Sequence, residues 1–370
     1  MRILPFHFIV LGAVGCTPLA ASARGAIAHI NATTRNHSAS AETVLIAENG
    51  TAKLPILISE SAGTETKTRA NELASYLERI TGGKFEIKKG MQGPGIFVGT
   101  IQQFPTPSAA EGLRVYDGYD GRDAYAIRTE GGYIKLLGAT DLGVSHAVSR
   151  FLESFGCRWF FPGSVWEVVP RRSKLTFNVN ETDRPEVLGA DFGYDLGQQY
   201  EKQDPDAGEA TKNWFRKNRV PRGFKSAAGH CAHNVVSRFW KEFEAHPEYR
   251  ALIKDEEGKL LRTGTGPETP KEQPLKLGSK SWGMWGQLCA SNPETVKLVT
   301  HYAQEWLDQN PAADMVGVGP DDGGEWCLCP ECAKLGDRGN QAFYLANQVA
   351  KAVQKSHPGA LVRGNSEVGL

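Results

Sequence analysis

Short apolar segments alternate with amphipathic helical segments in the second half of this chain, and this order limits the folds that it can adopt. A helical pattern runs from Asn292, a typical N-cap residue followed by proline, to Asn310. The apolar segment 315–319 comes next, and a second helical pattern covers 343–353. Because strands that alternate with helices pair in parallel, residues 185–370 are predicted to form βα units of a barrel or an open sheet.

The first half of the chain mixes helices and strands differently. Two amphipathic helices are predicted, at 70–80 and 144–155. A Glu-Gly-Gly turn at 130–132 joins two strand-like segments and indicates a hairpin. The predicted strands of this half are 54–58, 85–89, 96–98, 124–129, 133–137, 157–161 and 174–179. Residues 43–180 are therefore predicted to form one compact mixed α/β domain.

The composition is that of an ordinary globular protein, with 40% hydrophobic residues and 23% charged residues among 370. This length suggests about two domains. The chain carries 42 Lys and Arg residues and 42 Asp and Glu residues, so no net charge attracts nucleic acid or an anionic membrane. It also lacks a basic stripe and the known nucleic-acid-binding motifs. We therefore expect no nucleic-acid partner.

The N-terminus resembles an export signal. Arg2 supplies a positive charge, an apolar run follows at 3–14, and Ala-Ser-Ala forms a cleavage site that ends a predicted signal peptide at 1–23. The alternative is a lipoprotein signal that is acylated at Cys16. Residues 24–42 are polar and lack a period, which indicates a linker. The mature protein is predicted to be periplasmic or extracellular, without an integral membrane span.

The sequence PDDGGEWCLCPEC at 320–332 carries the strongest chemical signal. Asp321 and Asp322 lie where the apolar segment 315–319 becomes a glycine-rich loop. In a parallel βα fold, this carboxyl end of a strand bears the site. Two carboxylates there can divide the work of glycoside hydrolysis, because close like charges separate their pKa values. The alternative is structural, since Pro-Asp-Asp-Gly is ordinary turn chemistry.

Three cysteines follow the acidic pair at close spacing, namely Cys327, Cys329 and Cys332. Three thiolates this close can hold zinc with one further ligand. The candidates for that ligand are Cys289, Cys231, His230 and His233. A metal with four protein ligands would be structural, because no coordination position stays open. In an exported protein the rival interpretation is a disulfide, for example to Cys289, and both interpretations stay open.

A few other side chains are candidates for contacts with a ligand. His233 and Asn234 lie in a polar, glycine-containing stretch that is predicted to be a loop at the same mouth. Trp285 and Trp326 are aromatic surfaces on which a sugar ring could stack, as is Trp282. Buried core tryptophans are the commoner alternative. The sequence lacks a nucleophile elbow, a Walker loop and an H-E-x-x-H motif.

Several ordered segments resemble known families. The segment GRDAYAIRTEGGYIKLLGATDLGVSHAVSRFLESFGCRWFFPG resembles the accessory domain in front of family 67-type and family 20-type glycoside hydrolase barrels. The segments HPEYRALI, QLCASNPETVKLVT and VGVGPDDGGEWCLCPEC resemble the bacterial family known as domain of unknown function 4838. Part of that family is classed as glycoside hydrolase family 163, endo-β-N-acetylglucosaminidases that act on N-glycans.

The resemblance implies a (β/α)8 barrel behind the accessory domain, with an acidic pair after the fourth strand. It further implies substrate-assisted hydrolysis with retention, an exception to the usual two-carboxylate scheme. Asp321 would orient the 2-acetamido group of the substrate, and Asp322 would act as the acid/base. Glu325 is an alternative acid. By the same resemblance, His233 and Asn234 would contact the sugar.

The resemblance also implies further strands beyond this chain, so residues 185–370 are expected to form only the first half of the barrel. The predicted function is an exported glycoside hydrolase of hexosaminidase or endo-β-N-acetylglucosaminidase type that acts on glycans and requires no cofactor. The alternatives are a non-catalytic carbohydrate-binding or surface protein and an interaction module that zinc stabilises at the cysteines. The sequence does not specify the sugar, the linkage or the oligomeric state.

Overall fold

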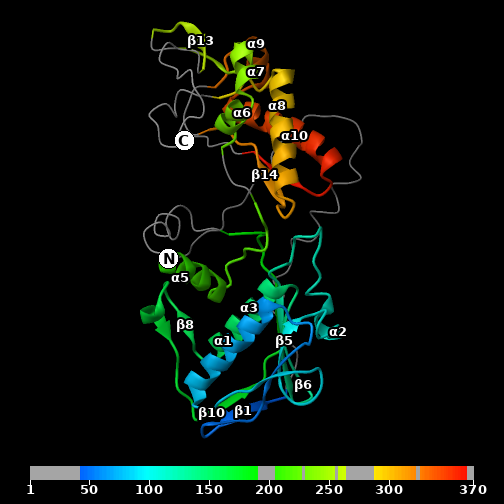
Figure 1. Cartoon of the computed structure of the whole chain (residues 1–370), viewed down its shortest axis with the longest axis vertical. Coiled ribbons are helices and arrows are strands. Elements are labelled where there is room, and N and C mark those ends of the chain that lie inside the picture. The colour runs from blue at the N-terminus through cyan, green and yellow to red at the C-terminus, as the bar shows by residue number, and fades with distance from the viewer. Residues whose placement is uncertain are drawn as a thin grey trace.

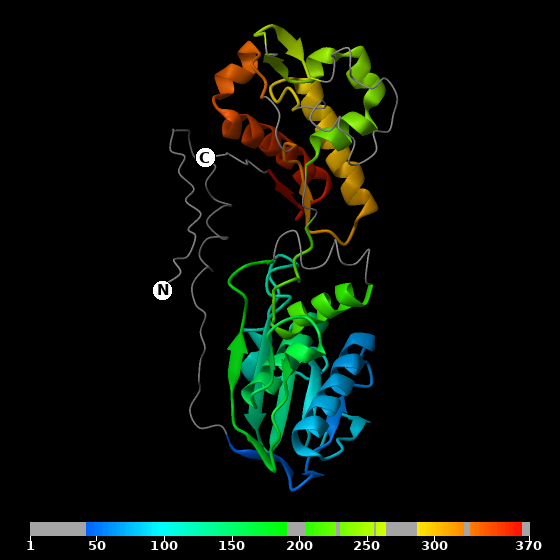
Figure 2. The same cartoon turned by 90° about the vertical axis from the view of Figure 1, so that its left-hand side faces the viewer.

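The computed structural model describes residues 42–190, 205–226, 230–254, 257–263, 287–321 and 326–364. The described residues form two lobes that are stacked along the long axis of the molecule (Figures 1 and 2). We define the first lobe as 42–217 and the second as 226–364. The predicted signal peptide with Cys16, most of the predicted linker and the candidate residues Asp322, Glu325, Trp282 and Trp285 lie outside the described residues.

A six-stranded mixed sheet is the centre of the first lobe, with strand order β11-β6-β7-β5-β3-β4. Strands β4, β3, β5 and β7 pair in parallel, whereas β6 is antiparallel to both β7 and β11. The strands are β3 (Ile56–Ile58), β4 (Ile87–Lys89), β5 (Ile96–Thr100), β6 (Tyr125–Glu130), β7 (Tyr133–Gly138) and β11 (Glu181–Asp183). The predicted hairpin across 130–132 and the mixed α/β class are confirmed.

The sheet separates two hydrophobic cores because successive residues of a strand point to opposite faces. In β5, Ile96 and Val98 belong to one core and Phe97 to the other. Helices α1 (Thr64–Thr81) and α3 (Asp141–Ser154) bury their apolar residues in the first core. Helix α1 ends at Gly82, whose φ of +77° favours glycine.

Smaller elements complete the first lobe. Strand β1 pairs with β10 and β2 in a second, three-stranded sheet. This strand was not predicted from the sequence. The remaining elements are β1 (Val44–Glu48), β2 (Thr51–Ala52), α2 (Pro107–Ala110), β8 (Arg158–Trp159), η1 (Ser164–Trp166), β9 (Glu167–Val168), β10 (Lys174–Phe177) and α5 (Pro205–Lys217). Within the described residues, no helix combines the length and the apolarity that a bilayer crossing needs.

The second lobe contains the predicted parallel units. Strand β14 (Met315–Gly317) pairs in parallel with β15 (Leu361–Arg363). On its other side, parallel bridges join Ser226 to Met315 and His230 to Gly319. The described residues thus place β14 between two parallel neighbours. A half-barrel with further strands remains a proposal. Residues 187–190 form no strand.

Helices cover this parallel group. Helix α8 (Pro293–Gln309) begins as predicted, because the Asn292 side chain accepts hydrogen bonds from the backbone N–H groups of Glu294 and Thr295. The other elements of the lobe are α6 (Ala232–Arg238), α7 (Trp240–Ala245), η3 (Pro247–Tyr249), β12 (Leu252–Lys254), β13 (Leu260–Arg262), α9 (Pro330–Leu335) and α10 (Arg338–Ser356). Helices α8 and α10 pack on each other and on the strands β14 and β15.

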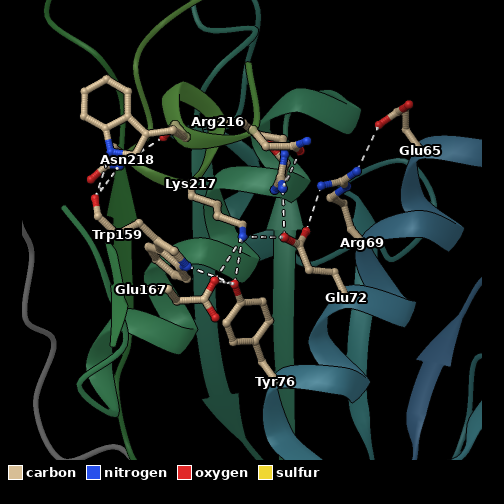
Figure 3. A network of polar contacts seen from close by, with 12 residues as sticks. Glu65, Arg69, Glu72, Tyr76, Trp159, Glu167, Arg216, Lys217 and Asn218 are labelled. Carbon is tan, nitrogen blue, oxygen red and sulfur yellow. Dashed lines mark hydrogen bonds and ion pairs between the residues drawn. The ribbon is translucent and has the colours of Figure 1, made fainter. Parts of the chain in front are cut away.

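Helix α5 packs on the rest of the first lobe through a network of polar contacts (Figure 3). The Arg216 guanidinium donates to Glu72 of α1 at 2.8 Å, and the Lys217 ammonium donates to the Tyr76 hydroxyl at 2.7 Å. The indole N–H of Trp159 donates to the same hydroxyl at 2.9 Å. Burial lowers the pKa of Lys217 and raises that of Tyr76, because it removes the water that would solvate their charged forms.

A forked ion pair joins the two lobes. The two terminal nitrogens of Arg122 donate to the two carboxylate oxygens of Asp314 at 2.7 and 2.9 Å. The backbone N–H of Lys225 donates to the same carboxylate at 2.8 Å. Next to this pair, the Asp123 carboxylate accepts from the N–H groups of Arg222 and Gly223 at 2.9 and 2.8 Å. The chain that leaves α5 is therefore fixed to the first lobe before it enters the second.

Replacing Arg122 by alanine should destabilise the second lobe. The Asp314 side chain is only 9% exposed and would lose its charged partner, so we expect the free energy of unfolding to fall by about 2–4 kcal/mol. Urea unfolding followed by tryptophan fluorescence measures this loss. The control is Arg238→Ala, because Arg238 forms an exposed pair with Glu305 that should contribute less than about 1 kcal/mol. Equal effects of the two variants would contradict the prediction.

Candidate functional site

The site is built where two parallel segments end side by side. Asp321 follows β14 after three residues, and His230 ends the neighbouring segment. The His230 ring nitrogen Nδ1 lies 2.6 Å from the Pro320 carbonyl oxygen, and the Cys231 N–H donates to the Gly319 carbonyl at 2.9 Å. The acidic motif and the histidine stretch therefore lie together, as the sequence predicted, at the carboxyl ends of parallel strands.

The Asp321 carboxylate is held by His233. One carboxylate oxygen accepts from the backbone N–H of His233 at 2.8 Å, and the other lies 2.9 Å from its ring nitrogen Nδ1. The Asp321 side chain is 10% exposed and that of His233 is 27% exposed. The pair is thus fixed in place by two contacts.

The predicted loop at His233 and Asn234 was wrong, because both residues lie in the first turn of helix α6. The first N–H groups of a helix have no intrahelical partner, and the Asp321 carboxylate satisfies one of them. The Asn234 amide donates to the His230 carbonyl at 3.1 Å. A helix this short gives no clear helical spacing of apolar residues in the sequence. The long-range contact with Asp321 favours the start of the helix at this position.

The Gln287 side chain holds the backbone of Asp321. This contact was not predicted from the sequence. Its side-chain amide donates to the Asp321 carbonyl at 2.7 Å, and the Asp321 N–H donates to its side-chain oxygen at 3.3 Å. Gln287 is 3% exposed, and its own carbonyl accepts from the Ala251 N–H at 2.9 Å. Gln287 is the polar first residue of the segment QLCAS, and this polarity was the signal in the sequence. The sequence alone does not show which backbone groups the side chain contacts.

A small cavity lies behind the Asp321 loop. Trp326, Gln287, Cys231 and Gln341 are among the residues that line it. Its volume of about 20 Å³ accommodates one water molecule but no sugar ring. Within the described part of the chain, the buried side-chain oxygen of Gln341 has no hydrogen-bond partner. A cavity of this size cannot itself be the binding site for a larger ligand.

Four buried cysteines gather beside this loop. The sulfur atoms of Cys289, Cys327, Cys329 and Cys332 all lie within 4.8 Å of one another. Cys329 precedes helix α9, and its sulfur accepts from the Cys332 N–H at 3.4 Å. The structure therefore selects Cys289 from the four candidates for the fourth ligand. All six cysteines that the structure describes are free of disulfides. The group can bind a metal ion.

The four sulfurs differ from the other described cysteines in their surroundings. Hydrogen bonds from the Cys327 and Cys332 thiols lower the pKa of Cys289 and favour its thiolate. The same contacts with Cys289 raise the pKa of Cys327 to about 11 and raise that of Cys332, so the thiolate is favoured at Cys289. Burial, with the nearby Glu167, raises the pKa of Cys157 to about 11, and burial raises that of Cys231. Cys157 and Cys231 are thus ordinary buried thiols, whereas Cys289 shares its proton with neighbouring sulfurs.

Comparisons with known proteins identify the family. The model of the family described as "Domain of unknown function (DUF4838)" matches residues 161–364, which is more than half of the chain. The chain belongs to this family. The resemblance of the motifs to DUF4838 is therefore confirmed, and the matched range includes Asp321, Gln287 and the four clustered cysteines. No curated protein matches this DUF4838 chain.

Solved structures that align with this chain include glycoside hydrolases of families 20 and 115. They include β-N-acetylhexosaminidases from Streptomyces coelicolor A3(2) and Bacteroides fragilis NCTC 9343, with TM-scores of 0.40 and 0.36 and identities of 13 and 14%. A chitobiase from Flavobacterium johnsoniae has a TM-score of 0.40 and 15% identity. Each alignment covers 89% of this chain but only 64, 64 and 51% of the three proteins, respectively. Similarity this distant assigns no activity.

Removing the Gln287 amide should loosen Asp321. In Gln287→Ala, the Asp321 N–H and C=O lose their partners, and we expect the free energy of unfolding to fall by about 1–3 kcal/mol. Hydrogen exchange at the Asp321 amide should also become faster. Gln304→Ala is the matched control, because Gln304 donates to Ser356 at an exposed site. Unchanged exchange at Asp321 in Gln287→Ala would show that the amide does not hold this backbone.

Proposed function

We propose that this chain is an exported glycoside hydrolase of the hexosaminidase type that acts on glycans containing N-acetylglucosamine. The observation that carries the proposal is the position of Asp321. Its carboxylate lies at the carboxyl end of the parallel strand β14 and is oriented by two contacts with His233. Parallel βα folds place their reactive groups at this end. The family-like motifs around Asp321 support the same class of enzyme.

The contacts of Asp321 suit an orienting role. A carboxylate offers about four acceptor positions, and His233 occupies two of them, so two remain for the substrate. One of these would accept the N–H of the 2-acetamido group. The acetamido oxygen would then attack the anomeric carbon as the glycosidic C–O bond breaks. The carboxylate would stabilise the positive oxazolinium ion that forms.

The proton would come from a neighbouring carboxyl. In this scheme Asp322 protonates the leaving oxygen and then removes a proton from the water that opens the oxazolinium ion, which retains the anomeric configuration. Glu325 is the alternative acid. The scheme uses no cofactor. His233 and Asn234 would bind sugar hydroxyls, and Trp285 and Trp326 would stack on sugar rings.

The proposal includes an organisation of the chain. Residues 43–180 would be an accessory domain, and residues 185–370 would form part of a (β/α)8 catalytic barrel. A signal peptide at 1–23 would export the protein to the periplasm or beyond, with Cys16 as the site of lipid anchoring in the alternative. Residues 24–42 would be the linker.

Substrates that differ in their leaving group separate the roles of the two aspartates. Asp322→Asn should lose roughly 10²–10⁴-fold in hydrolysis of an N-glycan core, because general acid catalysis is removed. It should retain activity on a nitrophenyl N-acetylglucosaminide, whose leaving group needs no proton. Asp321→Asn should lose activity on both substrates, since it no longer stabilises the acetamido group. Rates of product release for the full chain measure these effects.

The controls cover the alternatives. Asp308→Asn removes an exposed carboxylate and should leave both rates unchanged. If Glu325 is the acid, Glu325→Gln will show the pattern expected for Asp322→Asn. Substrates without the 2-acetamido group should not be cleaved. Glycan binding without turnover by the wild-type chain would contradict the proposal and favour a non-catalytic carbohydrate-binding protein.

A further inference from the structure

We propose that Cys289, Cys327, Cys329 and Cys332 bind one Zn²⁺ as a closed tetrathiolate, and that this zinc holds the Asp321 loop in place. Zinc binding is independent of the enzymatic activity. The positioning of the Asp321 loop rests on the proposed function only where it concerns catalysis.

The distances between the sulfurs fit a tetrahedral zinc. A Zn–S bond of about 2.3 Å places the sulfurs of a regular tetrahedron roughly 3.8 Å apart. The Cys289 sulfur lies 3.7 Å from that of Cys329 and 3.8 Å from that of Cys332. A disulfide needs a separation of about 2.05 Å. All four sulfurs lie within 4.8 Å of one another, and this clustering favours a shared ion over two separate pairs.

Backbone N–H groups surround the sulfurs and would offset their negative charge. Leu252 donates to the Cys327 sulfur at 3.3 Å, and Ser291 donates to the Cys332 sulfur at 3.4 Å. A zinc with four thiolates carries a net charge of −2, which is costly to bury without such donors. The N–H groups come from three segments of the chain, so the fold itself supplies the donors that surround the sulfurs.

The ligand set indicates zinc and a structural role. Four soft thiolates in a tetrahedral arrangement select zinc or iron and exclude hard cations such as magnesium or calcium. All four cysteines are buried, and four protein ligands leave no position open for water or substrate. Such a zinc takes no part in the hydrolysis of a glycan. Its effect would be on the segments that supply the ligands.

Those segments lie on both sides of the candidate site. Cys289 follows Gln287 by two residues, and Gln287 clamps the Asp321 backbone. Cys327 follows the loop that begins at Asp321, and its carbonyl accepts from the Gln341 amide at 3.3 Å. A single ion would therefore tie the support of Asp321 to the far end of its loop. Loss of the ion should release both.

Metal analysis of the full chain tests the assignment. Protein purified without chelators should contain one zinc ion per chain, and Cys289→Ala and Cys332→Ala should lose it. Cys157→Ala is the matched control, because it also removes a buried sulfur but lies in the first lobe, and it should retain the zinc. Replacing zinc by cobalt should give the visible bands of tetrahedral cobalt and a thiolate charge-transfer band.

Each other outcome contradicts a stated part of the proposal. Reduced thiols without metal, a disulfide found by peptide mass spectrometry, or iron instead of zinc would overturn the zinc assignment. If chelation removes the zinc without speeding hydrogen exchange at Asp321 and in residues 326–332, the positioning role is wrong. Metal content and exchange are measured without substrate, so a wild-type chain that hydrolyses no glycan would refute the proposed function alone.

Discussion

The forked ion pair between Arg122 and Asp314 is the contact on which the geometry of the site depends. Asp314 immediately precedes β14, and its backbone also aligns the neighbours of that strand. Its N–H donates to the Lys225 carbonyl at 2.7 Å, and its carbonyl accepts from the Leu361 N–H at 2.9 Å. One residue thus fixes the register of three parallel segments at their amino ends. Because register is shared along a strand, the carboxyl ends with His230 and Asp321 are aligned as well.

Polar contacts connect the two lobes, and the geometry of these contacts restricts the relative orientation of the lobes. Besides the Arg122 pair, the Asp123 carboxylate accepts hydrogen bonds from the backbone of Arg222 and Gly223, in the segment that leads from α5 to the second lobe. Hydrogen bonds are directional, so they fix the relative orientation of two surfaces closely. Apolar contact requires only that area is buried, so it fixes the orientation less closely. The first lobe is therefore well suited to set the angle at which the chain enters the parallel group.

The sequence predicted the elements whose signals are local. The long helices α1, α3, α8 and α10 and the β6–β7 hairpin follow from apolar periods, caps and glycine turns, which act within a few residues. It did not predict α6, the Gln287 clamp or the choice of Cys289 among four candidate ligands. Each of these depends on contacts between segments that are far apart in the chain, such as the pair of His233 and Asp321, 88 residues apart. Spacing along a sequence does not contain that information.

Under the two proposals, the motif at 320–332 would combine an acidic pair and a metal site, which have different requirements. Carboxylates that act on a ligand would need a segment that approaches it closely, and the two glycines in the sequence after Asp322 permit this at the cost of conformational freedom. Ordering such a loop costs roughly 1–2 kcal/mol per residue. If the proposed zinc binds, a ligand at Cys327, six residues after Asp321, fixes the far end of this segment, so the binding energy of the ion offsets part of the cost of ordering it. A ligand further along the chain would leave a longer segment to be ordered.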